Sequence, residues 1–166
     1  MVNLAITKVV KPKVIPCEDS LGFGRYFSDH MFVMDYQAGK DWHNPRIVPY
    51  GEVALFPSTM ALHYGQAIFE GMKAFRNKQN EIVIFRTRDH LTRLNRSAHI
   101  MSIPAIDTEA VYEFLHALIA MEKHWVPGKM GTSLYIRPFI IAADPCVGVK
   151  VSDTYRLFII LSPSGV

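Results

Sequence analysis

Tyr135 and Arg137 stand two residues apart in the apolar run 133–143 (SLYIRPFIIAA), which is typical of a β-strand. Side chains two apart on a strand leave the same face of the sheet, so the phenol and the guanidinium are expected to point the same way. Together they can offer several hydrogen-bond donors to one planar anion, such as a carboxylate or a phosphate. On spacing alone, the alternative is an outward arginine whose stem lies along a half-buried strand.

Four arginines form a second candidate anion receptor; they are Arg86, Arg88, Arg93 and Arg96. They occupy the end of a predicted strand and the start of the helix that follows it. A helix N-terminus and cationic side chains can hold a phosphate jointly. The alternative is a solvated basic helix face.

Metal and nucleophile chemistry receive no support from residue spacing. The seven histidines form no compact ligand pair, and Cys17 and Cys146 are too far apart in sequence for a short metal or redox motif. No nucleophile elbow, phosphate-binding glycine loop or dinucleotide fingerprint is present. The residues therefore predict two anion receptors, no metal site and no catalytic group.

Composition indicates an ordinary globular chain of 166 residues, with 49% hydrophobic residues, 20% charged residues and a net charge of +3. That length favours one domain. Interspersed charges of both signs argue against a nucleic-acid partner, and no apolar run is long enough to span a membrane. The N-terminus lacks the apolar core of a signal peptide, and two unpaired cysteines suit a reducing compartment, so a cytoplasmic location is expected.

Two strands, a short helix and a hairpin are predicted in the first half. Residues 31–36 and 53–56 are typical of strands, and the polar stretch between them contains the turn formers Gly39, Asn44 and Pro45. Ser58 is expected to cap a helix that ends at Gly71 and has apolar positions at Met60, Tyr64 and Ile68. Residues 72–76 and 81–86 flank a polar connection, which predicts an antiparallel hairpin.

Two longer helices and two long strands are predicted in the second half. One helix is expected between a Thr87 cap and Pro104, and another from Asp107 or Thr108 to Pro127-Gly128. The strands are 133–143, which Pro138 should confine to an edge or a bulge, and 154–162, which leads into a turn at 162–166. The predicted fold class is α+β, with a mostly antiparallel sheet and two main helices in two layers.

Three segments together resemble branched-chain amino acid aminotransferases. They are HYGQAIFEGMKAFR (63–76), RLNRSAHIM (93–101) and YIRPFIIAADPCVGVK (135–150). The resemblance also takes in FGRYFSDHM (23–31) and HWVPGKMGTSLYIRP (124–138). It implies a fold-type IV enzyme that uses pyridoxal 5'-phosphate to transfer the amino group between leucine, isoleucine or valine and 2-oxoglutarate. D-amino acid aminotransferases and aminodeoxychorismate lyases share this fold.

The resemblance also implies roles for individual residues. Arg93, in RLNRSA, corresponds to the arginine that binds the cofactor phosphate. Around the substrate it places Phe23, Tyr64, Phe69, Tyr135 and Arg137, and it places Val147 in a loop that reaches the neighbouring subunit's site in a homodimer. Arg137, assisted by Tyr135 and Tyr64, is expected to meet the distal carboxylate of glutamate. Ordinary packing is the alternative for Phe23, Tyr64, Phe69 and Val147.

The Schiff-base lysine, which binds the cofactor covalently in this family, matches none of the nine lysines and is expected outside this chain. Residues 1–166 are therefore predicted to be the small N-terminal domain of a longer enzyme, with 162–166 starting the interdomain connection and no catalytic residue in this part. Alone, the chain is expected to be inactive. The alternatives are a non-catalytic binding or assembly domain and another fold-type IV enzyme; YIRP and FEGMKAFR favour the branched-chain group.

Overall fold

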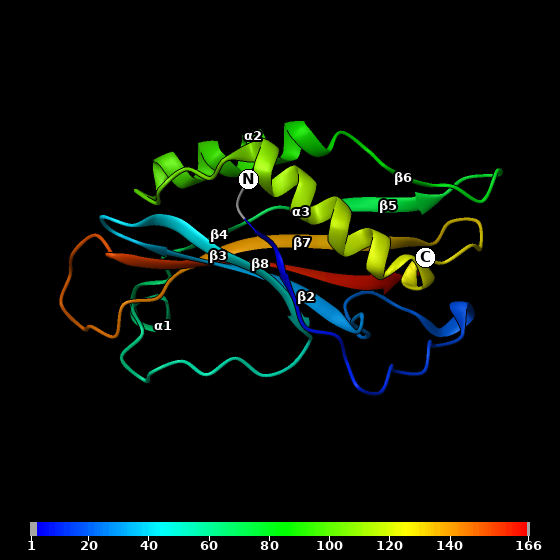
Figure 1. The fold of residues 1–166 in the computed structure, drawn as a ribbon, viewed down its shortest axis with the longest axis horizontal. Coiled ribbons are helices and arrows are strands. Elements are labelled where there is room, and N and C mark those ends of the chain that lie inside the picture. Colours follow the sequence, from blue (N-terminus) through cyan, green and yellow to red (C-terminus); the bar gives the residue numbers. More distant parts are fainter. Residues whose placement is uncertain (1–2, 166) are drawn as a thin grey trace.

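A computed structural model describes residues 3–165, which fold around one sheet (Figure 1). The strand order in the described part is β1-β3-β2-β8-β7-β5-β6, with β4 also paired to β7. All pairings are antiparallel except that of β1 with β3. The strands are β1 (Ala5–Ile6), β2 (His30–Gln37), β3 (Asp41–Pro49), β4 (Ala67–Phe69), β5 (Met72–Arg76), β6 (Ile82–Ile84), β7 (Ser133–Ala142) and β8 (Thr154–Ser164). The helices are α1 (Met60–Tyr64), α2 (Thr87–Ile100) and α3 (Thr108–Met121), with 3-10 turns η1 (Glu18–Ser20) and η2 (Lys123–Trp125).

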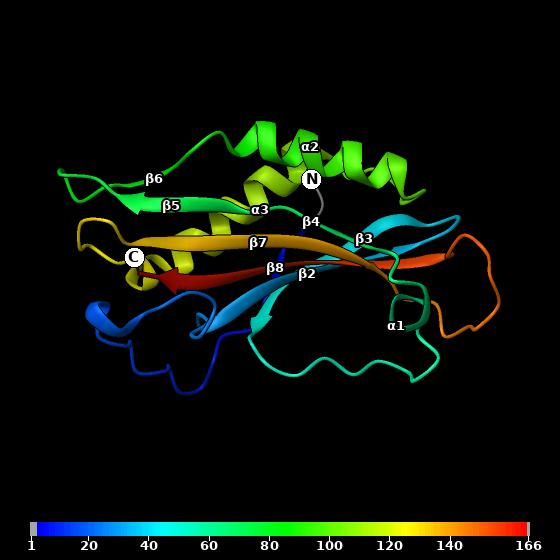
Figure 2. The same ribbon diagram turned by 180° about the vertical axis from the view of Figure 1, so that it is seen from behind.

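The two long helices cover one side of the sheet. Figures 1 and 2, which view the molecule from opposite sides, place α3 across one face of the sheet and α2 beside it. The core lies in this layer, where Leu134, Ile136 and Ile159 are fully buried with Leu91 and Leu115 of the helices. The predicted α+β class is confirmed. No helix within residues 3–165 is long and apolar enough to cross a membrane.

Helix α3 begins where the sequence predicts. The Asp107 side chain accepts hydrogen bonds from the backbone N–H groups of Glu109 and Ala110, which caps the helix. Helix α2 also forms as predicted, but Thr87 is its first residue and not its cap. The cap position belongs to Arg86, whose backbone is left-handed (φ 54°) and whose side chain makes no capping bond.

The prediction of a strand at residues 53–56 was wrong. The strand that follows β2 in the chain and pairs with it is β3, which includes Asn44 and Pro45, two of the residues expected in a turn. Asn44 has a positive φ of 55°, and the register with β2 shifts at this point. A bulge leaves one residue unpaired, so β3 tolerates a proline there and still buries Ile47.

The short helix α1 is shorter than predicted. It ends at Gly65, whose left-handed backbone (φ 64°) closes the C-terminus, and not at Gly71. Ile68 consequently lies in β4, paired with Ile140 of β7. Thr59, rather than Ser58, holds the N-cap position, and its side chain makes no capping bond.

Pro138 occupies the interior of the sheet, contrary to the prediction of an edge or a bulge. Strand β7 pairs with β8 on one side and with both β4 and β5 on the other. Pro138 lies at the junction of β4 and β5, where its carbonyl accepts the N–H of Glu70 and, because proline has no N–H, it donates no bond in return. Strand β8 also extends to Ser164, so the predicted turn at Ser162 was wrong. Val166, the last residue of the predicted interdomain connection, lies outside the described residues.

Candidate functional site: two anion receptors

Tyr135 and Arg137 lie on the same face of β7, as their spacing predicts. Their neighbours Leu134 and Ile136 are fully buried under the helices, so this pair is on the opposite face. The Arg137 guanidinium donates from Nη2 and Nε to Tyr135 Oη at 2.7 and 3.2 Å. The phenol oxygen accepts both bonds and keeps its own proton for another acceptor. Arg137 has no ion-pair partner within residues 3–165.

Gly71 allows the Tyr135 hydroxyl to occupy this position. A Cβ built on Gly71 would lie 2.2 Å from Tyr135 Oη and 2.9 Å from Cζ, closer than real Cβ contacts allow. The backbone of Gly71 therefore forms one wall of the phenol's site. This close approach connects the segment between β4 and β5 to the receptor on β7.

Two aromatic side chains predicted at the substrate site adjoin Arg137 and Tyr135. The Arg137 guanidinium carbon lies 4.2 Å from the centre of the Phe69 ring, and the Phe23 ring packs edgewise on Tyr135 at 5.0 Å. Both phenylalanines are 62% exposed, so they are not ordinary core residues. A pocket of about 170 Å³ lies here, lined by Phe23, Tyr135 and Arg137 together with Gly24, Phe27, Ile160 and Ser162.

Tyr64 and Val147 do not line that pocket. The Tyr64 hydroxyl donates to the backbone carbonyl of Val147, in the loop that follows β7. The Val147 side chain is 62% exposed. Asp144 holds the loop by accepting from the N–H of Asp153 and the hydroxyl of Thr154. The structure therefore brings Phe23, Phe69, Tyr135 and Arg137 together and joins Tyr64 to Val147 separately.

Arg93 lies on α2 beside a second pocket of about 400 Å³. Its Nε and Nη2 donate to the two carboxylate oxygens of Glu70 at 2.5 Å each, and His90 Nδ1 lies 3.2 Å from the same carboxylate. Arg86 and Arg96 line the pocket as well. Glu70 uses one edge of the Arg93 fork, so the edge that carries Nη1 remains for an external anion.

The Glu70 carboxylate is only 5% exposed but stays ionised. Burial by itself would raise its pKa, but the hydrogen bonds and charge of Arg93, with the bond from His90, lower the pKa of Glu70 below its ordinary value. Glu70 in turn raises the pKa of Arg93. The pair is thus a fixed, charged element of the second receptor.

Arg88 does not belong to the second receptor, although the sequence grouped it there. It donates to the Glu109 carboxylate at 2.9 Å, and its guanidinium carbon lies 3.8 Å from the Tyr112 ring centre. It therefore joins α2 to α3 on the side of the helices.

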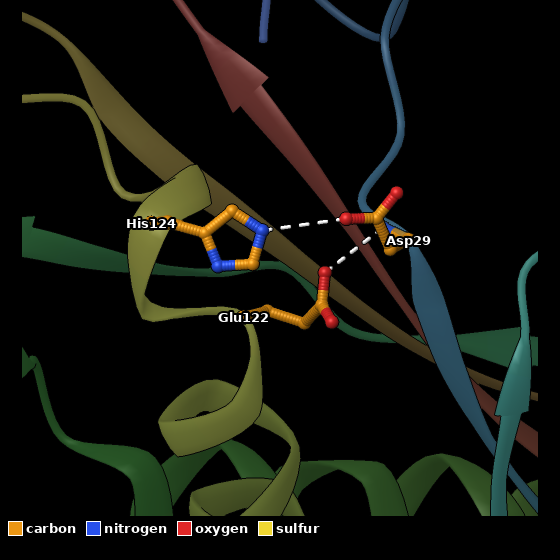
Figure 3. A group of neighbouring side chains, drawn as sticks. All are labelled: Asp29, Glu122 and His124. Atoms are coloured by element: carbon orange, nitrogen blue, oxygen red, sulfur yellow. Dashed lines mark hydrogen bonds and ion pairs between the residues drawn. The ribbon is translucent and has the colours of Figure 1, made fainter. Parts of the chain in front are cut away.

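A cluster of ionisable side chains that sequence spacing did not indicate lies at the end of α3. Figure 3 shows the side chains of Asp29, Glu122 and His124 facing one another. One carboxylate oxygen or ring nitrogen from each lies within 4.8 Å of those of the other two. Protein donors already engage these carboxylates. Asp29 accepts from the Lys13 N–H at 2.8 Å and the Trp125 indole at 3.1 Å, and Glu122 accepts from the Asp29 N–H at 2.8 Å. The cluster is therefore a hydrogen-bonded junction.

The hydrogen-bond partners of His30 in the same junction determine which of its ring nitrogens carries the proton. The N–H of Val9 donates to His30 Nε2 at 2.9 Å, so that nitrogen is the acceptor. His30 Nδ1 then carries the proton and donates it to Glu122 Oε1 at 2.5 Å. A neutral His30 thus completes the partners of Glu122.

Three residues of the receptors were missed from the sequence: Glu70, Gly71 and Ser162. Glu70 and Gly71 stand inside the FEGMKAFR segment, where a lone carboxylate and a glycine follow an apolar run; that pattern was the available signal. The sequence around Ser162 contains no pattern that indicates a site, because Ser162 comes to lie opposite Tyr135 only through the pairing of β7 with β8.

The architecture and the two receptors define a class, the fold-type IV aminotransferases. A solved branched-chain aminotransferase from Thermoproteus uzoniensis, crystallised with norvaline, superposes with a TM-score of 0.64 at 26% identity, over 82% of this chain and 41% of that one. No model of a known protein family matches the chain.

Within that class, the chain is a homologue of the N-terminal part of branched-chain amino acid aminotransferases. It is 52% identical over 158 residues to branched-chain-amino-acid transaminase 1 of Bacillus subtilis, covering 95% of this chain and 44% of that protein. It is 49% identical over 164 residues to branched-chain-amino-acid aminotransferase 2 of the same organism, covering 99% and 45%. The chain thus spans under half the length of the curated relatives it matches.

Proposed function

We propose that this chain forms the part of a branched-chain amino acid aminotransferase that receives the cofactor phosphate and the substrate side chain. The observation that carries the proposal is Arg137, a guanidinium with no carboxylate partner among residues 3–165, set against Tyr135 and Phe69 on the open face of the sheet. Half-identical relatives named as branched-chain aminotransferases support it.

The second receptor fits the phosphate of pyridoxal 5'-phosphate. Arg93 keeps one guanidinium edge free, Glu70 holds the other edge, and Arg96 adds charge to the same pocket. These donors suit an oxyanion with several acceptor oxygens. When bound, the cofactor supplies the electron sink that lets an amino group move between an amino acid and an oxo acid.

The first receptor suits a substrate that is sometimes apolar and sometimes anionic. Phe23 and Phe69 offer aromatic surface to a branched aliphatic side chain. Arg137 and the Tyr135 proton can bind the distal carboxylate of glutamate in the same place. One pocket can then serve both half-reactions, because its charge sits beside its apolar wall.

Substitution of Arg137 by Ala in the longer enzyme tests this role. Loss of a charged hydrogen-bond donor to a carboxylate should lower kcat/KM for glutamate by about ten- to hundredfold. Turnover of leucine should change much less, because an aliphatic side chain makes no charged bond there. Steady-state kinetics with both amino acids measure the ratio. An unchanged glutamate-to-leucine ratio would show that Arg137 does not have this role.

We also propose that residues 1–166 alone neither transaminate nor bind the cofactor covalently. Borohydride reduction in the presence of pyridoxal 5'-phosphate, followed by peptide mapping, should leave no stoichiometric lysine adduct. Lys73 is the lysine to inspect, because it lies opposite Tyr135 on β5 and lines a further pocket of about 530 Å³ together with Tyr135 and His90. A stoichiometric adduct on any lysine of the chain would overturn this proposal.

In the longer protein the exposed Val147 side chain is proposed to contact a neighbouring subunit of a homodimer in the cytoplasm. The support is the loop's construction: Tyr64 and Asp144 hold its backbone while Val147, Val149 and Val151 stay exposed. A rigid loop with apolar side chains outward suits a protein contact.

A further inference from the structure

Among residues 3–165, Ser162 has the one side-chain hydroxyl oxygen that is fully buried and also lacks a hydrogen-bond partner. It is 4% exposed, and its Oγ is buried without a hydrogen-bond partner. By contrast, Ser28 Oγ donates to the His30 carbonyl at 2.8 Å, and Ser152 Oγ donates to the Thr154 carbonyl at 2.7 Å. An unpaired buried hydroxyl costs free energy in the folded state, so its presence calls for a partner.

The position of Ser162 indicates where that partner binds. Ser162 lies directly opposite Tyr135 in the β7–β8 ladder, and opposed residues project from the same face of a sheet. It lines the pocket of about 170 Å³ together with Tyr135 and Arg137. Phe23, packed on the Tyr135 ring, and Ile160 form apolar walls.

The polar groups of this pocket are all able to donate. The Arg137 guanidinium has no carboxylate partner, the Tyr135 proton is not used in its bonds with Arg137, and the Ser162 hydroxyl is free. Three side chains that each keep at least one unused donor, with no carboxylate among them, are complementary to an anion. The pocket is smaller than most ligand cavities, so it accommodates one arm of a substrate rather than a whole molecule.

We propose that the Ser162 hydroxyl donates a hydrogen bond to the carboxylate arm that Arg137 binds, and that Ser162 is thereby a specificity residue for the anionic substrate. The inference rests on the proposed function, since it assigns the pocket to the dicarboxylic partner of the transfer. It goes further in naming a residue of β8 that completes the receptor and distinguishes a carboxylate from an aliphatic side chain.

Binding of glutarate to residues 1–166, measured by calorimetry, tests the proposal without the rest of the enzyme. Glutaramide, its neutral diamide, is the control probe. Ser162→Ala should weaken glutarate binding about tenfold, and Ser162→Thr, which keeps the hydroxyl, should bind more tightly than Ser162→Ala. Ser164→Ala is the matched control, because Ser164 is buried on the same strand outside the pocket. Equal binding by Ser162→Ala and the unmodified chain, an equal loss in Ser164→Ala, or no glutarate binding at millimolar concentration would overturn the proposal.

Stability separates this role from a structural one. Because the Ser162 hydroxyl is unpaired without ligand, Ser162→Ala should keep or raise the urea midpoint, whereas Ser28→Ala should lower it by losing a bond. A lowered midpoint in Ser162→Ala would indicate a structural hydroxyl and contradict the proposal.

Kinetics of the longer enzyme distinguish failure of this inference from failure of the proposed function. Ser162→Ala should raise KM for glutamate and leave KM for leucine nearly unchanged. Active transamination with an unchanged glutamate KM would refute the Ser162 role alone. Absence of transamination in the unmodified enzyme would refute the proposed function, and the glutarate result would still decide the role of Ser162.

Discussion

The Tyr135 hydroxyl can lie where it does because the residue that it contacts, Gly71, has no side chain. Gly71 does not need a positive φ, so its role is steric and not conformational. The phenol oxygen against the Gly71 backbone is also the acceptor for Arg137. The absence of a Cβ at Gly71 therefore determines how the Arg137 guanidinium is oriented.

Gly71→Ala should displace the Tyr135 ring and weaken its bond with Arg137. We expect the free energy of unfolding to fall by about 1–3 kcal/mol, as in other overpacked sites, together with weaker binding of carboxylates. Urea unfolding and glutarate titration measure the two effects. Gly51→Ala is the control, because nothing lies within 4 Å of a Cβ at Gly51 and its φ is not positive. Equal effects of the two substitutions would contradict the steric role.

At the scale of elements, Glu122 joins three parts of the chain. It follows α3, its Oε2 accepts the N–H of Asp29 before β2, and its Oε1 accepts the Nδ1 proton of His30, which in turn binds Val9 of the N-terminal segment. Glu122 is 1% exposed. Removal of one partner from a buried network leaves the others unpaired, which costs more than the bonds themselves contribute.

Glu122→Ala should therefore lower the free energy of unfolding by about 3 kcal/mol. Glu113→Ala, on the exposed side of α3, should change it by less than about 0.5 kcal/mol. Denaturant titration gives both values. Because protein donors already occupy the carboxylates of the cluster, a metal chelator should not change the melting temperature. A chelator-sensitive transition would show that this junction is held by an ion.

Elements were predicted correctly where their formation depends on residues close together in the sequence. The α3 cap at Asp107 and the hairpin of β5 and β6 depend on residues close in sequence, and both formed as predicted. The strand expected at residues 53–56 did not form, because apolar residues make a strand only when a partner is available. Strand β3 occupies that place beside β2, and its bulge at Asn44 accommodates residues that usually indicate a turn.

At the scale of the whole molecule, stability depends on several buried or half-buried carboxylates that are ionised in the folded state. Burial alone would raise the pKa of each, but hydrogen bonds and cationic neighbours lower it below its ordinary value, which is 3.8 for aspartate and 4.5 for glutamate. These groups are Asp29, Asp35, Glu70 and Asp144. The unfolded chain thus binds more protons than the folded one when the pH falls through this range.

Stability should accordingly be constant above the ordinary carboxylate pKa and decline as the pH falls from about 5 toward about 3. Urea midpoints across that range measure the slope. Glu70→Gln removes one contributing carboxylate and should flatten the curve, whereas Glu113→Gln on the exposed face should not. A midpoint that rises on acidification would contradict the assignment of these carboxylates as ionised.

The sequence by itself determined the elements with local causes and the face that Tyr135 and Arg137 share, because side-chain direction in a strand alternates with every residue. Its resemblance to branched-chain aminotransferases indicated the class that the comparisons support. Only the tertiary structure decided that Glu70 holds Arg93, that Gly71 faces Tyr135 and that Ser162 stands unpaired beside them. These contacts join strands and helices far apart in the chain, and their energies depend on distances and burial that no local pattern encodes.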